Sequence, residues 1–444
     1  MSSSTNRKLS RKKIPILIVT IAIVAFFLLF PLILVEVVVK NDGTWNPGTS
    51  YQRYRAAEYP ADKNFFQWWY FSLKDYDLGE TFAFTYALSR PATNQTYRGS
   101  YVMMAYVSNA TRFHIYYRFP LESLLVTGDC NLSINGTTFT QEAFTSNHIR
   151  IQGRMNQSAN LWVAEGISPD TNITWNLDIY RIAGWYGQQD IEGLVKLTEV
   201  IAWNTYSYDS EVNGSVTING TSYLISRSPR FRIYCDMNWG KNFPRGDPSI
   251  DFMWGWYYTG VPNANTTQDF AMIAGVGRSV CSISVVSPMY AKFASMYNRG
   301  ERLGVKFGQL LDLAEDSGVP LVHKASDGNC IDFHVDRTDW VNLTDAFGTA
   351  RIPLTQVVTI ETTTRKVVMT FHSAAHNYNR LLFPTDGYIF SDFEGLSVNC
   401  TTDIYAKTYP SWDLAKVYPI TTLEETLNDV NGGIEFGYQV EMSL

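Results

Sequence analysis

The stretch Phe65-Phe66-Gln67-Trp68-Trp69-Tyr70-Phe71 predicts a strand near the start of a β-rich region. Successive residues of a strand point to opposite faces of the sheet, so Trp68 and Tyr70 share one face. Two interpretations stay open: both faces pack inside the protein, or one face lines a cavity for an apolar ligand. A second aromatic stretch, Trp254-Gly255-Trp256-Tyr257-Tyr258, and Trp239 before it allow the same two interpretations.

The rest of the sequence is dominated by β patterns. The pairs Asn135-Gly136 and Asn219-Gly220 predict two-residue hairpin turns, because both residue types tolerate positive φ angles. A helical pattern is confined to residues 303–315 and 423–427. Further strands are expected at residues 80–88, 112–118, 352–361 and 366–371, the last two as a pair.

The length predicts two domains, because about 400 residues follow the N-terminal apolar segment. Pro and Gly interrupt the β pattern at residues 241–248, where we expect a linker. The predicted fold is mostly β: two antiparallel β-barrel or β-sandwich domains after an N-terminal transmembrane helix. The expected segments are a cytosolic basic tail (1–13), a transmembrane signal anchor (14–39), a stalk (40–60), an N-terminal domain (61–240) and a C-terminal domain (249–444).

Residues 14–35 are almost unbroken apolar sequence, long enough as a helix to cross a bilayer. Five basic residues lie within residues 7–13, just before this segment, which places the N-terminus in the cytosol. A cleaved signal peptide is the alternative, but its apolar core is shorter and no Ala-x-Ala cleavage pattern follows here. We therefore expect a single-pass type II membrane protein of the secretory pathway or plasma membrane. Its lipid-bilayer contact is at residues 14–39, and its C-terminal domain is lumenal or extracellular.

Asn-x-Ser/Thr sequons agree with this orientation, because N-glycosylation takes place on the lumenal side. None of them lies in the tail or in the apolar segment. The eleven predicted glycosylation sites are Asn94, Asn109, Asn131, Asn135, Asn156, Asn172, Asn213, Asn219, Asn265, Asn342 and Asn399.

Composition argues against several classes of partner. The formal net charge is −6, and basic residues cluster only in the N-terminal tail, so a nucleic-acid partner is not expected. The odd number of cysteines, five, leaves at least one unpaired within a monomer. No C-x-x-C pair or Cys/His cluster occurs, so no metal site is expected. The cysteines are Cys130, Cys235, Cys281, Cys330 and Cys400.

Two motifs resemble a known family. Gln67-Trp68-Trp69-Tyr70-Phe71 resembles the E-W-W-Y-F signature of the carotenoid 1,2-hydratase (hydroxyneurosporene synthase)/AttH-like family. Asp236-Met237-Asn238-Trp239-Gly240 resembles its D-H-N-W-G signature, and the resemblance spans about residues 58–444. It implies two lipocalin-like β domains with an apolar ligand pocket, similar in fold to tocopherol cyclases and fungal Diels-Alderases. It also implies isoprenoid or polyene substrates and no cofactor.

The sequence departs from the family pattern at two positions, Gln67 in place of Glu and Met237 in place of His. Hydration of an alkene needs an acid and a base, and neither an amide nor a thioether titrates. Hydration is therefore in doubt at these positions. A cyclisation or isomerisation that depends on preorganised binding tolerates both changes.

Asp236 is the one catalytic candidate that the motifs retain. It can act as an acid if burial raises its pKa. The competing interpretation, which we favour from the sequence, is a carboxylate that caps a turn or pairs with Arg232 or Arg245.

Other polar patterns predict no chemistry. His334 and Asp336 alternate on one strand, which is typical of an exposed strand face. His372 and His376 have the i, i+4 spacing of a helical metal site, but their flanks predict a strand followed by a loop. The sequence has no G-x-S-x-G elbow of a serine hydrolase.

The sequence predicts a hydrophobic small molecule as ligand, bound by aromatic residues with Asp236 and Asn238 as polar contacts. Cofactor-free cyclisation or isomerisation is the first hypothesis. A lipid carrier without chemistry and a structural surface glycoprotein are the alternatives; the sequence specifies neither the ligand nor the oligomeric state. The expected pocket residues are Trp68, Tyr70, Asn238, Trp239, Trp256, Tyr257 and Tyr258.

Overall fold

The protein is described from a computed structural model, and it consists almost entirely of antiparallel β-strands. In the described part of the chain, helical turns are short 3-10 segments, and no helix is long and apolar enough to cross a membrane. The apolar segment at 14–35 lies outside this part, so the transmembrane anchor stays a prediction. The described residues are 39–40, 54, 56, 63–92, 95–128, 131–136, 139–145, 147–156, 158–183, 188–190, 201–240, 254–279, 289–299, 301–305, 307–312, 320–325, 332–345, 347–361, 365–384, 389–408 and 420–440.

Two sheets are built from the first half of the chain. The nine-stranded sheet runs in the order β1 (Val39–Lys40), β12 (Gln188–Asp190), β13 (Ile201–Ser207), β16 (Phe231–Gly240), β2 (Phe65–Asp75), β3 (Glu80–Arg90), β4 (Gly99–Val107), β5 (Arg112–Phe119) and β10 (Leu161–Glu165). The seven-stranded sheet runs in the order β15 (Thr221–Ile225), β14 (Asp209–Ile218), β11 (Ile173–Ala183), β9 (His148–Met155), β8 (Phe139–Thr145), β7 (Asn131–Ile134) and β6 (Leu124–Thr127).

The second half of the chain forms one twelve-stranded sheet. Its order is β22 (Pro320–Ala325), β21 (Phe307–Asp312), β19 (Met289–Asn298), β18 (Phe270–Ser279), β17 (Trp254–Val261), β28 (Ile420–Val440), β27 (Ile389–Thr408), β25 (Arg365–His372), β24 (Gly348–Glu361) and β23 (Asp332–Asp345), with β20 (Glu301–Val305) on β19 and β26 (Tyr378–Pro384) on β27. Among described residues, no strand of one half pairs with a strand of the other, and the expected linker at 241–248 lies outside them.

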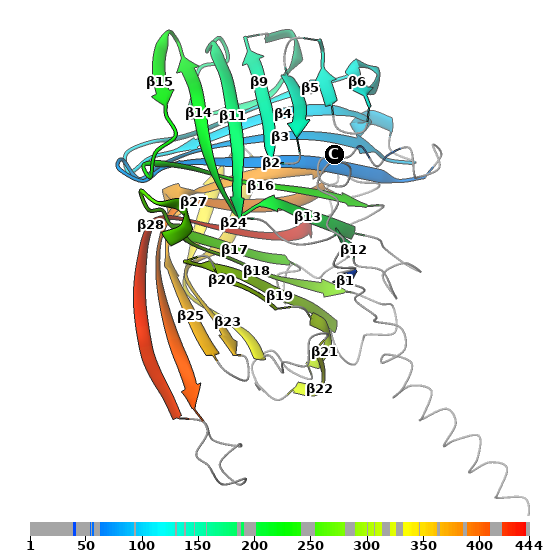
Figure 1. Cartoon of the computed structure of the whole chain (residues 1–444). Helices are drawn as coiled ribbons and strands as arrows, with labels where there is room; N and C mark the ends of the chain where they lie inside the picture. The colour runs from blue at the N-terminus through cyan, green and yellow to red at the C-terminus, as the bar shows by residue number, and fades with distance from the viewer. Residues whose placement is uncertain are drawn as a thin grey trace, which may run out of the picture.

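The three sheets lie in layers, with the nine-stranded sheet in the middle (Figure 1). One hydrophobic cluster fills the space between the nine- and seven-stranded sheets, and a second joins the nine-stranded sheet to the C-terminal sheet. Every residue of β2 is buried, because both faces of this strand are covered. Tyr54 and Ala56, which we had assigned to the stalk, pack against the first cluster. The middle sheet is therefore the element that both halves share.

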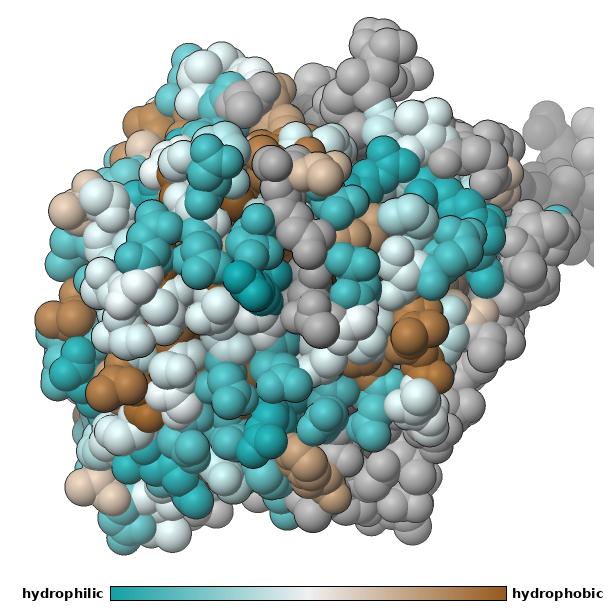
Figure 2. Space-filling view, turned by 90° about the horizontal axis from the view of Figure 1, so that it is seen from above, coloured by the Kyte–Doolittle hydropathy of each residue, from teal (hydrophilic) through white to brown (hydrophobic). Residues whose placement is uncertain are grey.

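The seven-stranded sheet forms the outer layer of the first half. Seen from above, this side of the molecule is largely hydrophilic, with hydrophobic residues scattered rather than gathered (Figure 2). Ten sequon asparagines are described; nine are exposed, Asn213 is half-buried, and Asn94 lies outside the described residues.

The predicted β content, hairpins and strand pair are confirmed. Asn135 and Gly136 have φ angles of 51° and 67°, and Asn219 and Gly220 have φ angles of 49° and 83°, as a type I′ turn requires. β24 pairs with β25 as expected from their sequence. The His334 and Asp336 side chains are 32% and 60% exposed, as predicted for an outward strand face.

Both expected helices are wrong. Residues 301–305 and 307–312 form β20 and β21, and residues 423–427 lie within β28. In β28, Leu423 is opposite Tyr405 and Leu427 is opposite Thr402 of β27. The Leu- and Glu-rich composition favours helix only weakly, and the long ladder with β27 overrides that preference.

Candidate functional site

Strands β2 and β16 bring the two sequence motifs side by side in the middle sheet. Asp236 is directly opposite Tyr70, and Asn238 is opposite Trp68. The odd-numbered residues of both strands face the seven-stranded sheet, and the even-numbered residues face the C-terminal half. The predicted sharing of one face by Trp68 and Tyr70 is thus confirmed, and Asp236 joins them on it.

The C-terminal sheet presents acidic residues to this face. Glu435 of β28 lies between Trp256 of β17 and Glu394 of β27 in the strand register. Asp392 precedes Glu394 by two residues and therefore points the same way. One carboxylate oxygen each from Asp392, Glu394 and Glu435 lies within 4.8 Å of the other two. We call these three residues and Asp236 the carboxyl cluster.

Aromatic hydroxyl and indole groups donate hydrogen bonds into the carboxyl cluster from two sides. On one side, Trp256 Nε1 donates to the Tyr234 hydroxyl at 2.6 Å, and Tyr234 donates to Asp236 Oδ2 at 2.6 Å. Asn238 Nδ2 adds a longer contact of 3.4 Å to Asp236 Oδ1. Asp236 thus accepts from donors of the first half, and Trp256 of the second half donates to one of those donors.

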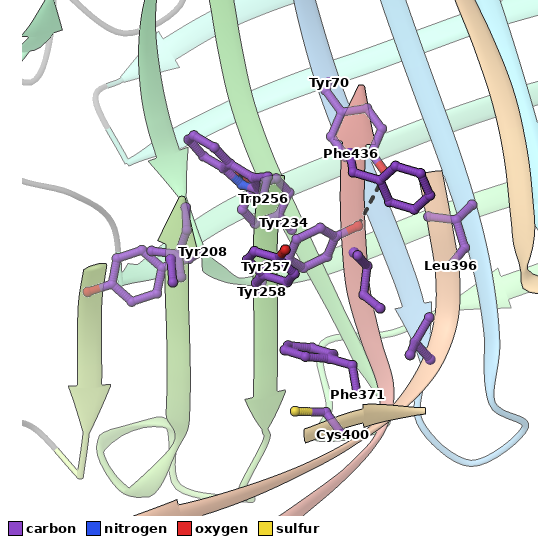
Figure 3. Packing of buried hydrophobic residues seen from close by; sticks show 14 of the residues in the cluster. Tyr70, Tyr208, Tyr234, Trp256, Tyr257, Tyr258, Phe371, Leu396, Cys400 and Phe436 are labelled. Atoms are coloured by element: carbon purple, nitrogen blue, oxygen red, sulfur yellow. Dashed lines mark hydrogen bonds between the residues drawn. The ribbon is translucent and has the colours of Figure 1, made fainter. Parts of the chain in front are cut away.

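On the other side, the Tyr70 hydroxyl donates to Glu394 Oε2 at 2.8 Å. The Tyr258 hydroxyl lies 3.2 Å from that of Tyr70 (Figure 3). The rings of Tyr258 and Tyr234 stack with centroids 4.3 Å apart, so the two donor sets are in contact.

The carboxyl cluster is buried, and three of its acids have no basic partner among the described residues. Its four side chains are at most 4% exposed. In the described part of the chain, no basic side chain lies within ion-pair distance of Asp236, Asp392 or Glu394. A buried carboxylate without a positive partner is costly, so the neutral form is favoured.

The direction of the pKa shifts follows from this environment. Burial first, and then the Glu435 carboxylate, raise the pKa of Asp236 well above its usual range, although the hydrogen bond from Tyr234 lowers it. Burial and Glu435 likewise raise the pKa values of Asp392 and Glu394. The cluster can therefore hold protons at neutral pH and donate them.

Oxygen ligands of this kind also suit a hard divalent cation. Asp392, Glu394 and Glu435 are the residues that could hold one. The sequence spacing gave no sign of this group, because two members lie near the start of β27 and the third near the end of β28, and both strands are long. The expectation of no metal site rested on cysteine and histidine spacing alone.

Open space lies along the edge of the same interface. A surface hollow of about 460 Å³ is lined by residues that include Tyr76, Arg230 and Val430. It shares Tyr76, Gly260, Val261 and Pro262 with a water-sized void of about 10 Å³. Tyr234 lines that void and donates to Asp236, so it connects the void to the carboxyl cluster.

Five of the seven expected pocket residues point into this interface. Two do not. Trp239 packs in the other cluster, between the nine- and seven-stranded sheets. Tyr257 points to the opposite side of β17, where its hydroxyl donates to Gln356 at 2.9 Å. The five are Trp68, Tyr70, Asn238, Trp256 and Tyr258.

The expected pairing of Asp236 with Arg232 is wrong. Arg232 Nη2 instead lies 3.0 Å from Asp269 Oδ2, and its Nε lies 3.4 Å from Asp209 Oδ1. Arg232 and Asp236 are four residues apart on one strand, about 13 Å along it, so they cannot meet on their shared face. Arg245 lies outside the described residues.

Sequence reasoning missed Tyr234 and the three C-terminal acids of the carboxyl cluster. Tyr234 carried a usable signal, since it precedes Asp236 by two residues in a buried strand. The acids carried none, because Asp and Glu in exposed strands are common.

The two departures from the family motifs touch each other away from the carboxyl cluster. Gln67 Nε2 donates to Met237 Sδ at 3.0 Å, and both side chains are fully buried. Their strand positions place them on the odd-numbered face, in the core of the first half. The loss of a titrating pair there leaves the acids of the interface in place.

Comparisons with known proteins found solved structures that resemble this chain weakly. No family model matches the sequence, and a search of curated proteins found no match. Among solved structures, CghA has a TM-score of 0.45 at 8% identity, covering 85% of this chain and 89% of its own. Kievitone hydratase from Nectria haematococca has a TM-score of 0.45 at 11% identity, covering 89% and 95%. A putative AttH from Nitrosomonas europaea has a TM-score of 0.45 at 11% identity, covering 85% and 93%. At these scores and identities, the chemistry of those proteins does not carry over to this chain.

Proposed function

We propose that the chain catalyses cofactor-free cyclisation or isomerisation of a hydrophobic small molecule of the isoprenoid or polyene class. The observation that carries this proposal is the carboxyl cluster: four buried acids among aromatic side chains at the interface between two β units, with the pKa raised at Asp236, Asp392 and Glu394. An acid that stays protonated at neutral pH is what protonation of an alkene requires.

Asp236 is the proposed proton donor. Its O–H bond breaks as a C–H bond forms on the alkene, leaving a carboxylate and a carbocation. In a cyclisation a second double bond then attacks the cation, which closes a ring and moves the positive charge to the far carbon of that double bond. In either reaction a C–H bond next to the cationic carbon finally breaks, forms a double bond and releases its proton. That proton returns to the carboxylate, so the reaction consumes no co-reactant.

The surroundings of Asp236 fit these steps. Tyr234 donates to the carboxylate that remains, and so stabilises it. The π-faces of Trp256, Tyr234 and Tyr258 attract positive charge, and all three are buried. Apolar walls with few polar groups are typical of small-molecule sites.

The test uses the full-length protein in detergent and a panel of isoprenoid and polyene lipids in deuterated water. A product that carries one carbon-bound deuterium, detected by mass spectrometry, would report protonation from the site. Asp236→Asn should abolish it, while Asp336→Asn, which changes an exposed carboxylate, should not. Binding with no deuterium incorporation would overturn catalysis and leave the lipid carrier as the function.

The proposal includes the membrane anchor and the glycans. Residues 14–39 would hold the β units where apolar substrates partition, and the exposure of nine sequon asparagines supports modification. A lipocalin-like type for both units is part of the same proposal. Endoglycosidase treatment should lower the apparent mass of the protein from a eukaryotic host. Protease added outside sealed vesicles prepared from the secretory pathway should leave the β units intact.

A further inference from the structure

A buried lysine lies at the edge of the same interface. Lys74, in β2, is 4% exposed and faces the C-terminal half, like Tyr70. It is directly opposite Arg232 in the ladder with β16. A fully buried lysine is rare in proteins unless a carboxylate pairs with it.

Lys74 has no such pair. Within the described residues, no carboxylate oxygen lies within ion-pair distance of its Nζ, and no acceptor takes a hydrogen bond from it. Its contacts are aromatic: Nζ lies 4.7 Å from the ring centroid of Tyr258 and 6.0 Å from that of Tyr76.

Asp429 is the acid whose charge acts most strongly on Lys74, but its carboxylate is held by other donors. Its Oδ2 accepts from Thr259 Oγ1 and from the Gly260 backbone, each at 2.8 Å, and its Oδ1 accepts from the Asn431 backbone at 2.7 Å. The amine of Lys74 is consequently available for a partner that the described residues do not provide.

The side chain of Lys74 lines the void of about 10 Å³, which has room for one water molecule. Tyr76, Gly260, Val261 and Pro262 separate this void from the surface hollow of about 460 Å³. The walls of both spaces mix apolar residues such as Val261 and Pro262 with charged ones, Asp77 and Arg230 in the hollow and Asp209 and Arg232 in the void. They suit a small apolar group that reaches the amine from the hollow.

We propose that Lys74 is a covalent binding residue for the carbonyl group of a small apolar aldehyde. The amine nitrogen attacks the carbonyl carbon to form a C–N bond and a carbinolamine. Loss of one water molecule then gives the C=N bond of a Schiff base. No oxidant, reductant or cofactor takes part.

The local electrostatics support both steps. Burial is the main cause that lowers the pKa of Lys74, which raises the share of neutral, nucleophilic amine. Asp209 lines the same void, and burial followed by the neighbouring Asp269 carboxylate raises its pKa. A protonated Asp209 can supply the proton with which the carbinolamine hydroxyl leaves as water.

The experiment treats the full-length protein with a limiting amount of hexanal and sodium cyanoborohydride, which traps a Schiff base as a stable secondary amine. Peptide mapping by mass spectrometry then locates the adduct. Lys74 should be modified before Lys63, which is exposed, and before Lys366, which pairs with Glu361 at 3.2 Å. Adducts on those two lysines with the Lys74 peptide unmodified would overturn the proposal.

Two variants test whether the adduct needs the Lys74 amine itself or only a positive charge at this position. Lys74→Met should lose the mapped adduct completely. Lys74→Arg, which keeps a cation over Tyr258, should lose it as well, and this variant covers the case in which Lys74→Met fails to fold. Asp236→Asn should still form the adduct, so this proposal and the proposed proton transfer can fail separately.

Discussion

The interface holds two buried polar groups of opposite design. The carboxyl cluster contains acids, and in the described part of the chain none of Asp236, Asp392 and Glu394 has a basic partner. The second group, which we call the charged cluster, mixes signs: Lys74 and Arg232 with Asp209, Asp269 and Asp429. Arg232 lies between two carboxylates there, at 3.0 Å from Asp269 and 3.4 Å from Asp209.

The difference shows that burial alone does not set the chemistry of an acid. Both clusters are almost inaccessible to water, yet one contains fixed positive charge and the other contains hydroxyl donors. Arg232 lowers the pKa of Asp209 and the Tyr234 hydroxyl lowers that of Asp236, but in both clusters burial outweighs this help and raises the pKa. The charged cluster is therefore suited to joining the two halves, and the carboxyl cluster to storing protons.

The largest expected effect comes from removing the arginine of the charged cluster. Arg232→Leu leaves Asp209 and Asp269 buried without their cation, which should lower the free energy of unfolding by about 3–5 kcal/mol. Urea denaturation of the full-length protein, followed by tryptophan fluorescence, measures it. The matched control is Arg227→Leu, because Arg227 is 48% exposed and pairs with Glu211. That change should cost at most about 1 kcal/mol. Equal losses would show that the Arg232 ion pairs do not matter to the fold.

The carboxyl cluster should make stability fall as pH rises. The pKa values of Asp236, Asp392 and Glu394 are raised in the folded state, so the folded protein binds more protons than the unfolded chain above the ordinary carboxyl range. The stabilisation is full below the unfolded pKa, near 4, and is lost toward the folded pKa. Each such carboxyl contributes a slope of up to about 1.4 kcal/mol per pH unit.

Melting temperatures across the pH range test this expectation. The double variant Asp236→Asn/Glu394→Gln imitates the neutral acids and should flatten the decline. Asp336→Asn provides the control, since its carboxylate is exposed. An unchanged slope in the double variant would mean that the acids are already ionised in the folded protein.

The sequence predicted the strands and turns around the site better than the polar groups in it. The alternation in residues 65–71 was enough to place Trp68 and Tyr70 on one face, because a strand has a fixed period of two. The Asn-Gly turns set the two hairpins for a similar local reason. The acids that lie across the interface from Asp236 come from β27 and β28 of the other half of the chain. No local sequence pattern predicts that these strands meet β16.

The same limit explains the errors. Asp236 was expected to pair with Arg232 because both lie in one short segment, but the partners of Arg232 come from β14 and from the residue that precedes β18. Trp239 was grouped with Tyr70 by motif membership, although its odd-numbered position puts it on the other face of β16. Residues 423–427 look helical in isolation and become strand through pairing with β27.

Gly433 tests whether Tyr258 links the two clusters. A Cβ atom at this position would lie 2.0 Å from Cζ of Tyr258, so alanine must displace the ring that faces Lys74 and stacks on Tyr234. Gly433→Ala should cost about 1–3 kcal/mol. The control, Gly260→Ala, meets the Tyr76 hydroxyl at 3.1 Å and the Phe270 carbonyl oxygen at an ordinary contact distance of 3.5 Å, and should change stability by less than about 1 kcal/mol. Equal melting temperatures for the two variants would show that the ring can move freely.

The smallest effect is expected from a single hydroxyl. Tyr70 donates its proton to Glu394, so its oxygen accepts from Tyr258, whose hydroxyl can donate there at 3.2 Å or to Ser72 at 3.3 Å. Tyr258→Phe should cost about 0.5–1.5 kcal/mol. It should also weaken the Tyr70 donation, because hydrogen bonds in a chain polarise one another.

That donation lowers the pKa of Glu394, so its weakening should raise this pKa further and steepen the loss of stability with rising pH. Tyr257→Phe is the matched control: it also removes a buried hydroxyl bond, at 2.9 Å to Gln356, but on the other side of β17. The two variants should lose similar stability at acidic pH and diverge as the pH rises. Parallel curves would assign Tyr258 to packing alone and separate the two clusters energetically.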